Sequence, residues 1–209
     1  TSGVNVMSEL DDLTYRYDEL SDVAKCRAIE KLHARFEPDY NWWDSVYESA
    51  SEFGSHLGSL AVRGFDTHGR WIAWDGHFRF TDEALEFMAQ NYGGEQAQEI
   101  IAYMQETLAL YRLGKQALEL EDQGLWADYG MDRRNQGTTL DYSVLHYTED
   151  NRLSDELYIR LVKIKEDLSG MFLKWLGDEY DYLTSDEYML EMAECYDVKF
   201  DEDGFIVDD

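Results

Sequence analysis

Lysine and arginine are scarce in this chain. They number 18 against 45 aspartates and glutamates, so the formal net charge is −27. A surface with that charge repels nucleic acids and anionic membranes, and it attracts basic proteins. The charge balance therefore predicts a basic protein partner and excludes direct binding to nucleic acid or to a membrane.

Proline is also nearly absent, since Pro38 is the only one in the sequence. Disordered acidic segments are rich in proline and poor in aromatic side chains. Here 14% of the residues are aromatic and 44% are hydrophobic, which supplies a sizeable core. We therefore expect the acidic residues to lie on the surface of a folded domain.

Long hydrophobic runs are missing as well. No stretch of about 20 apolar residues exists, which predicts that the chain does not span a membrane. No basic-then-apolar signal opens the sequence, so we expect a cytoplasmic protein. Residues 1–6, which precede Met7, are treated as a candidate expression remnant. The two cysteines, Cys26 and Cys195, each lie in an apolar helical pattern, which predicts buried reduced thiols.

Motifs for catalysis or cofactor binding are absent from the sequence. The histidines and cysteines show no zinc-ligand spacing. There is no phosphate-binding glycine loop and no nucleophile elbow. The acidic turn at 201–204 ends in glycine like a calcium loop, but Lys199 stands where an EF-hand needs an acid or an amide. We therefore expect neither an enzyme nor a cofactor or metal ion.

Hydrophobic periodicity predicts an α+β fold that is predominantly helical, and helices are expected to open at Ser21, Thr81 and Ser185, whose hydroxyls suit helix starts. Helices are expected near 21–36, 42–57, 81–93 and 95–122, from 154 onward, and at 185–196. Short antiparallel hairpins are expected near 59–80 and 198–207, with a further short strand at 13–17. Segment 123–151 is predicted to be an irregular insert with one strand near 142–147. We expect residues 7–209 to form a single acidic domain.

The spacing of large apolar side chains predicts which helix faces are buried. The predicted core residues are Val23, Cys26, Ile29 and Leu32 on the first helix, Ala97, Ile101, Met104, Leu108 and Tyr111 on the helix from 95, and Leu157, Leu161, Ile164, Leu168, Phe172 and Trp175 on the helix from 154. We expect the first of these helices to pack against the last, because neither can bury its apolar face alone. The basic pair Arg133-Arg134 could dock on the acidic body or join two copies as a homodimer.

Acidic residues recur at one-turn spacing on two of the predicted helices. Asp44, Glu48 and Glu52 form one row, with no lysine or arginine between residues 41 and 62. Glu187, Glu191 and Glu194 form a second row, and Asp178, Glu179 and Asp181 precede it. Like charges at this spacing destabilise a helix by about 0.2–0.5 kcal/mol per pair. Helix formation alone therefore does not explain the rows.

Two explanations of the rows remain open. Acidic side chains improve solubility, and that effect alone could account for them. Alternatively, carboxylates one turn apart stand about 6 Å from each other along the helix axis, a spacing comparable to that of phosphates along a nucleic-acid strand. Rows on rigid helices would then mimic a polyanion.

Both ends of the chain resemble a known family. The segments Tyr17–Lys25, Asp39–Glu48, Glu179–Glu187 and Phe200–Gly204 resemble an acidic family that is spread through bacteriophage, prophage and plasmid genomes. Some of its members are labelled antitoxin of a toxin–antitoxin stability system. The middle of the chain, from about 65 to 151, departs from the family pattern. The resemblance implies an origin in a mobile element and a host bacterial cytoplasm, and it supplies no catalytic residues.

Together these features predict an inhibitor of a host defence protein. The expected partner is a basic nucleic-acid-binding protein or nuclease complex, such as a restriction enzyme or a CRISPR effector, whose cleft the acidic surface would occupy. The expected contact residues are Asp44, Glu48, Glu52, Asp178, Glu179, Asp181, Glu187, Glu191 and Glu194. The alternatives are an antitoxin that neutralises a partner toxin and a virion or assembly protein.

Overall fold

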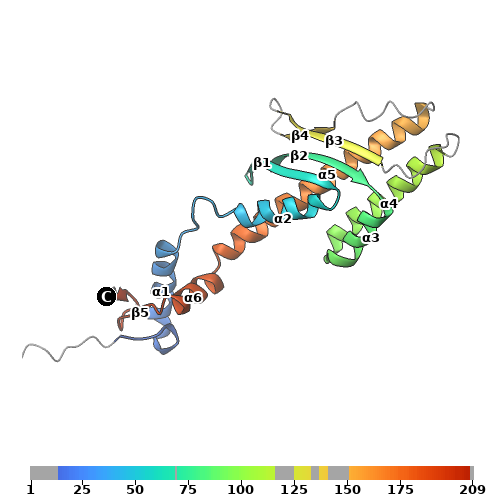
Figure 1. Ribbon diagram of the computed structural model, residues 1–209. Helices are drawn as coiled ribbons and strands as arrows, with labels where there is room; N and C mark the ends of the chain where they lie inside the picture. The colour runs from blue at the N-terminus through green and yellow to red at the C-terminus, as the bar shows by residue number, and fades with distance from the viewer. Residues whose placement is uncertain (1–13, 69, 116–124, 133–136, 141–150, 208–209) are drawn as a thin grey trace, which may run out of the picture. The chain divides into compact units, whose positions relative to one another are not determined.

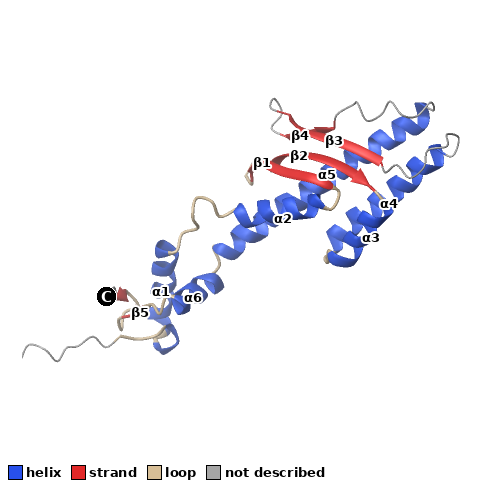
Figure 2. Ribbon diagram, viewed as in Figure 1, coloured by secondary structure: helices blue, strands red, loops and turns tan. Residues whose placement is uncertain are grey.

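The computed structural model describes residues 14–68, 70–115, 125–132, 137–140 and 151–207. It shows an α+β protein in which helices predominate, as predicted (Figures 1 and 2). The chain divides into two compact units. Residues Thr1–Trp42 and Glu179–Asp209 form the first, here called the terminal unit, and Trp43–Asp178 form the second, the central unit. Whether the two units form one domain over 7–209 stays a prediction.

The central unit is an antiparallel sheet with helices packed on it. Its elements in chain order are α2 (Asp44–Ser55), β1 (Gly58–Asp66), β2 (Trp71–Phe80), α3 (Asp82–Asn91), α4 (Glu95–Lys115), β3 (Leu125–Asp132), β4 (Gly137–Leu140) and α5 (Asn151–Leu183), the last of which ends in the terminal unit. The strand order is β1-β2-β3-β4 and every pair is antiparallel. Each strand therefore lies beside its neighbour in sequence, with helices inserted between β2 and β3.

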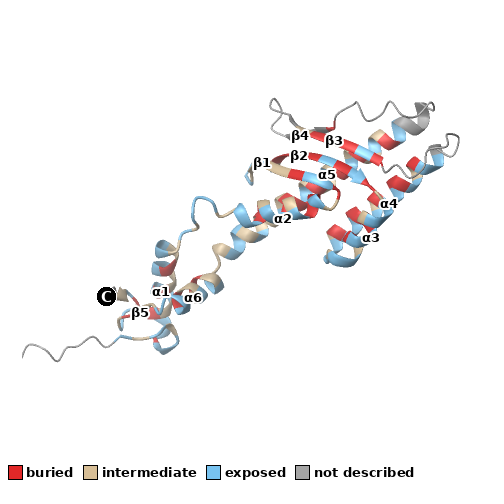
Figure 3. Cartoon of the chain, in the orientation of Figure 1, coloured by how far each residue is buried: buried red, intermediate tan, exposed pale blue. Residues whose placement is uncertain are grey.

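Strand β2 provides the centre of the core in this unit. Trp74, Phe78 and Phe80 are fully buried and alternate with the exposed residues His77 and Arg79, as expected of a sheet with one face in the core (Figure 3). The indole nitrogen of Trp74 donates a 3.0 Å hydrogen bond to the Ser169 hydroxyl on α5. Apolar burial and a satisfied polar atom together hold α5 against the sheet.

Strand β3 fixes α5 a second time. Tyr129 is buried, and its hydroxyl donates a 3.1 Å hydrogen bond to the carbonyl oxygen of Leu161. Burial raises the pKa of this phenol, so it stays protonated and keeps donating. On β1, Phe65 packs edge-on against Trp43 and Tyr47. These contacts bring α2 to the face of the sheet on which α5 packs.

The terminal unit joins the two ends of the described chain. It contains the 3-10 turn η1 (Tyr17–Glu19), α1 (Asp22–Arg35), α6 (Asp186–Cys195), β5 (Lys199–Phe200) and β6 (Ile206–Val207). Its core consists of Leu20, Ala24, Ala28, Leu32, Met189, Ala193 and Phe200. The predicted caps are confirmed, because the Ser21 hydroxyl accepts from the Ala24 amide and the Ser185 hydroxyl from the Tyr188 amide.

The buried face of α1 differs from the prediction. Val23 is 66% exposed and Cys26 is also exposed, as is Cys195 on α6, so the expected buried thiols are wrong. The helix buries Ala24, Ala28 and the predicted Leu32 in the core that it shares with α6, and the predicted Ile29 is partly buried there. The expected packing of this helix against the helix from 154 stays a prediction. Alanines permit a close approach of two helices, and a pattern of large apolar residues does not mark them. On α4 and α5 the predicted stripes are buried, apart from the half-buried Trp175.

The predicted irregular insert is also corrected by the structure. Residues 125–132 and 137–140 form β3 and β4, which complete the sheet. In β3 the buried residues Leu125, Ala127 and Tyr129 alternate with outward-facing ones. This alternation of apolar and outward-facing residues is present in the sequence. The aspartates and glycines around it, which are uncommon in strands, made it hard to recognise. The predicted strand near 142–147 and the pair Arg133-Arg134 lie outside the described residues.

Two helix boundaries and one strand also shift. Helix α5 begins at Asn151 and not near 154. Helix α4 is described as far as Lys115, and the rest of its predicted length to 122 lies outside the described residues. Of the strand predicted at 13–17, the described part contributes a single antiparallel bridge, between Tyr15 and Phe200, before η1 begins.

Leu168 offers a test of the α5 packing. Its side chain is fully buried, so Leu168→Ala should lower the free energy of unfolding by about 2–5 kcal/mol. Ile159 lies on the same helix but is 64% exposed, which makes Ile159→Ala the matched control. The control should change the free energy by no more than about 0.5 kcal/mol. Urea denaturation of the full chain measures both, and equal losses would contradict the described burial.

Gly204 offers a test of the terminal unit. Its φ is +87°, and a Cβ there would lie 2.2 Å from the carbonyl oxygen of Ala24 on α1. Gly204→Ala should therefore destabilise this unit by more than about 1 kcal/mol. In Gly177→Ala the new methyl group meets nothing within 4 Å, and helix propensity should raise stability by up to about 1 kcal/mol. Opposite signs in thermal melts are expected, and a harmless Gly204→Ala would refute this turn geometry.

Candidate partner-binding site

Helix α2 carries the first predicted row of carboxylates. Asp44, Glu48 and Glu52 are all exposed, as the amphipathic pattern requires. The opposite face of α2 is held in the core by Val46 and Phe53, among others. This packing fixes the rotation of the helix and turns the whole row toward solvent.

The α2 row is locally unfavourable for the helix that carries it. Asp44 lies in the first turn, where the helix dipole stabilises a carboxylate, but Glu52 lies in the last turn, where the dipole opposes it. The negative charge of Glu52 also acts on a neighbouring phenol, because burial and Glu52 together raise the pKa of Tyr92. No ion pair among the described residues involves Asp44, Glu48 or Glu52.

Helix α6 carries the second row. Glu187, Glu191 and Glu194 are exposed, while Met189 and Ala193 face the core. Glu194 lies near the C-terminal end of α6, where no basic residue offsets the dipole. The hydroxyl of Tyr182 donates a 2.7 Å hydrogen bond to Glu191, and this bond raises the pKa of the phenol. Glu191 is thereby held in a fixed orientation at the surface.

The three acids at the end of α5 differ from one another. Lys174 donates a hydrogen bond to Asp178 one turn away, so part of the charge of Asp178 is already balanced within the chain. Glu179 is half-buried, and Asp181 is exposed. Asp181 is therefore the best placed of the three to meet a partner.

The nine predicted residues fall into two sets, one on each unit. Asp44, Glu48, Glu52 and Asp178 belong to the central unit, and Glu179, Asp181, Glu187, Glu191 and Glu194 belong to the terminal unit. Within each helix the row is continuous, as predicted. Each unit therefore presents a candidate surface by itself.

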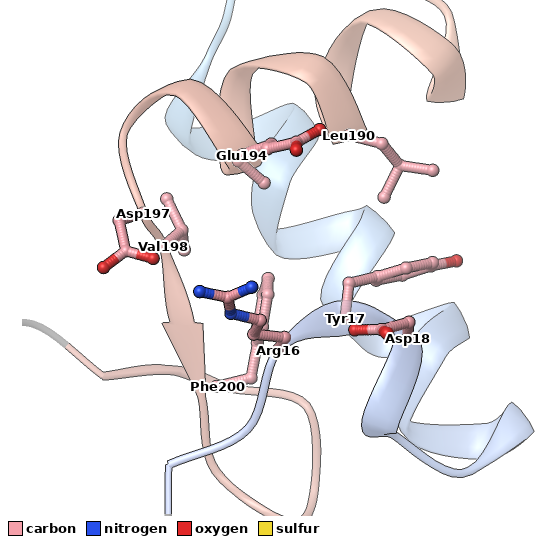
Figure 4. Close-up of a pocket in the computed structure, with 9 residues that line it drawn as sticks. Arg16, Tyr17, Asp18, Leu190, Glu194, Asp197, Val198 and Phe200 are labelled. Atoms are coloured by element: carbon pink, nitrogen blue, oxygen red, sulfur yellow. The ribbon is translucent and has the colours of Figure 1, made fainter.

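A cavity of about 540 Å³ opens in the terminal unit beside the α6 row (Figure 4). It lies between the segment that enters η1, the second half of α6 and strand β5. Its lining residues are Arg16, Tyr17, Asp18, Leu190, Ala193, Glu194, Asp197, Val198 and Phe200. Glu194 thus belongs both to the carboxylate row and to the cavity.

Main-chain contacts between distant segments create this cavity. The Tyr15 amide donates to the Phe200 carbonyl at 2.7 Å, and the Phe200 amide returns the bond at 2.9 Å. Asp197 has a φ of +49°, which turns the chain out of α6. The Val198 amide then donates to the Ala193 carbonyl at 2.8 Å. These bonds place the start of β5 opposite η1.

Sequence reasoning identified only Glu194 among the cavity residues. The others come from segments more than 170 positions apart, and no periodic pattern links them.

The outer face of the sheet holds basic residues that the sequence analysis did not single out. Arg63 is paired with Asp75 at 2.7 Å, and His77 contacts Asp128 on the neighbouring strand. The Arg79 guanidinium lies 5.5 Å from the ring centre of Trp126. Arg63 and Arg79 are thus engaged by side chains of their own sheet.

In the part of the chain that the structure describes, no group of three or more His, Cys, Asp or Glu side chains is placed to hold a metal ion. In the acidic turn, Asp201 accepts hydrogen bonds from the amides of Asp203 and Phe205, so its carboxylate stabilises the turn. Each helix within the described ranges is either too short or too polar to form a membrane span.

The like-charge repulsion in the α2 row can be measured directly. Glu48→Gln removes both i,i+4 pairs of the row, so it should raise the free energy of unfolding by about 0.4–1 kcal/mol. Glu166 on α5 has no acidic residue four positions away and lies near Lys163, so Glu166→Gln should leave stability unchanged or slightly lower. Denaturation at low ionic strength compares the two. A loss of stability in Glu48→Gln would show that the row is not under repulsion.

Comparisons with known proteins add no family to this geometry. No protein-family model matches the chain, and no significant match is found among curated proteins or among solved structures. The resemblance to acidic mobile-element proteins accordingly stays a prediction.

Proposed function

We propose that this protein binds and inhibits a basic, nucleic-acid-binding host protein by presenting carboxylates in place of phosphates. The observation that supports the proposal is the pair of exposed rows on α2 and α6. They lie on helices whose other faces are packed, and they work against the stability of those helices. A feature that lowers stability and faces solvent is expected where a partner supplies the missing cations.

The geometry of the rows suits a nucleic-acid-binding cleft. Carboxylates four residues apart on a helix are separated by about 6 Å along its axis. The core contacts of Val46 and Phe53 hold the α2 row in place before any partner arrives. Binding therefore requires little further ordering of the backbone, which reduces the entropic cost of association.

Charge-led binding has a characteristic dependence on salt. Interactions between exposed charges are screened over a Debye length of about 10 Å at 0.1 M salt and about 3 Å at 1 M. The complex should form fast at low ionic strength and weaken steeply as salt rises. Acidity that served solubility alone would produce no saturable complex with a defined partner.

A capture experiment tests the proposal. The full chain is immobilised and exposed to the heparin-binding fraction of a bacterial lysate at low salt, with and without a competing duplex DNA of about 20 base pairs. We expect nucleic-acid-binding proteins to be retained and to be displaced by the duplex. Two variants neutralise the rows: Asp44→Asn with Glu48→Gln and Glu52→Gln, and Glu187→Gln with Glu191→Gln and Glu194→Gln.

A matched control separates the rows from total charge. Glu86→Gln, Glu99→Gln and Glu166→Gln together remove the same charge from exposed positions outside the rows. The proposal requires at least one row variant to reduce retention about tenfold or more while the control stays near wild type. Equal loss in all three variants, or no retained nucleic-acid-binding protein, would overturn it. Retention of a protein that lacks nucleic-acid affinity and arrests growth when expressed alone would favour the antitoxin alternative.

A further inference from the structure

We infer that the cavity of the terminal unit is a docking pocket for a short peptide segment of the partner, with an apolar side chain flanked by arginine. This inference rests on the proposed function, because it assigns a specific part of the basic partner to a specific place beside the α6 row. The inference goes beyond charge attraction, because a cavity can also discriminate between ligands by the shape of their side chains.

The wall of the cavity is suited to an apolar side chain. Leu190 and Ala193 come from α6, Val198 and Phe200 from the chain that follows it, and Tyr17 from η1. Leu190 and Val198 are partly exposed and can contact a ligand, whereas Phe200 is fully buried and Ala193 nearly so, which anchors this wall in the core. A preformed apolar surface favours binding because the ligand pays for little reorganisation.

The rim of the cavity is acidic. Three acidic residues, Asp18, Glu194 and Asp197, and one basic residue, Arg16, line the cavity, and the Arg16 guanidinium lies on the side of Asp197 (Figure 4). Asp197 is already bonded to Lys199 at 2.5 Å, and this bond, helped by Arg16, lowers its pKa. Asp18 and Glu194 make no ion pair or side-chain hydrogen bond among the described residues.

The rim charge determines the chemistry of the ligand. A carboxylate ligand would approach three acids to reach one guanidinium, whereas a cationic ligand is attracted by Asp18 and Glu194. Arginine suits these carboxylates because its planar guanidinium can donate paired hydrogen bonds. Its aliphatic stem can also lie along the apolar wall.

The size of the cavity favours a peptide over an ion. A volume of about 540 Å³ falls within the range of about 300–1,000 Å³ typical of ligand pockets. That space accommodates a short segment rather than one cation. Binding sites between proteins generally concentrate their energy in a few buried anchors surrounded by polar residues. An apolar anchor with flanking arginines reproduces that pattern.

Two synthetic peptides test the inference by titration of the isotope-labelled full chain in NMR. The first is a capped pentapeptide with leucine between two arginines and glycine at each end, and the second has serine in place of the leucine. Both carry the same charge. We expect the leucine peptide to bind at least about tenfold more tightly, as burial of a leucine side chain predicts. The largest shifts should occur at the amides of Leu190, Ala193 and Phe200.

A variant of the pocket wall provides the control. Leu190→Ser should remove the preference for the leucine peptide, and Leu113→Ser, at a position that is 65% exposed in the central unit, should preserve it. Glu194→Gln should weaken both peptides severalfold. Thermal melts verify that each variant is folded. Equal affinity for the two peptides, or a preference that survives Leu190→Ser, would overturn the inference.

The two proposals fail separately. If the row variants lose the captured protein but the peptides bind equally, the pocket inference is wrong and the proposed function stands. If the leucine peptide is preferred at the pocket but no nucleic-acid-binding protein is captured, the pocket stands and the proposed function is wrong.

Discussion

Repulsion among surface carboxylates is the constraint that the rest of this structure must satisfy. A net charge of −27 on 209 residues raises the energy of any compact state. The opposing contribution comes from aromatic burial, as seen around Trp74, which meets Phe78, Tyr129 and Phe172. Local ion pairs help little, because exposed pairs such as Lys163 with Asp167 contribute less than about 1 kcal/mol each. The aromatic core is therefore what makes so acidic a surface compatible with folding.

The two units satisfy this constraint in different ways. The central unit buries large rings between a sheet and helices. The terminal unit has a smaller core, built around alanines that let α1 and α6 approach closely, with Phe200 as its largest buried side chain. Hydrogen bonds between distant main-chain segments, such as those joining Tyr15 and Phe200, complete it.

Much of the fold could be predicted from local sequence patterns. Ser21, Thr81 and Ser185 cap their helices as expected, and the hairpin of β1 and β2 follows from β-rich segments on either side of a turn. The prediction failed where the signal was small or non-local. The alternation of Leu125, Ala127 and Tyr129 is short and interrupted by aspartate and glycine, and the buried face of α1 is marked by alanines, which occur on exposed faces just as readily.

The candidate site was predictable only in part. Exposure of the acidic rows follows from helix periodicity, because the opposite faces hold Val46, Phe53 and Met189. The cavity does not follow from any period, because it depends on the pairing of Tyr15 with Phe200 and on the turn at Asp197. Such long-range pairings are set by the global fold, and a single sequence does not reveal them.

The pairing of the chain's two ends has a consequence for synthesis. Residues 16–18 leave the ribosome long before residues 190–200, so the cavity cannot exist until the later segment has emerged. The α2 row needs no such wait for its helix, because α2 and the hairpin on which it packs are contiguous in sequence. During translation the nascent chain can therefore display the acidic surface of α2 before the cavity forms, because the cavity also needs residues 190–200.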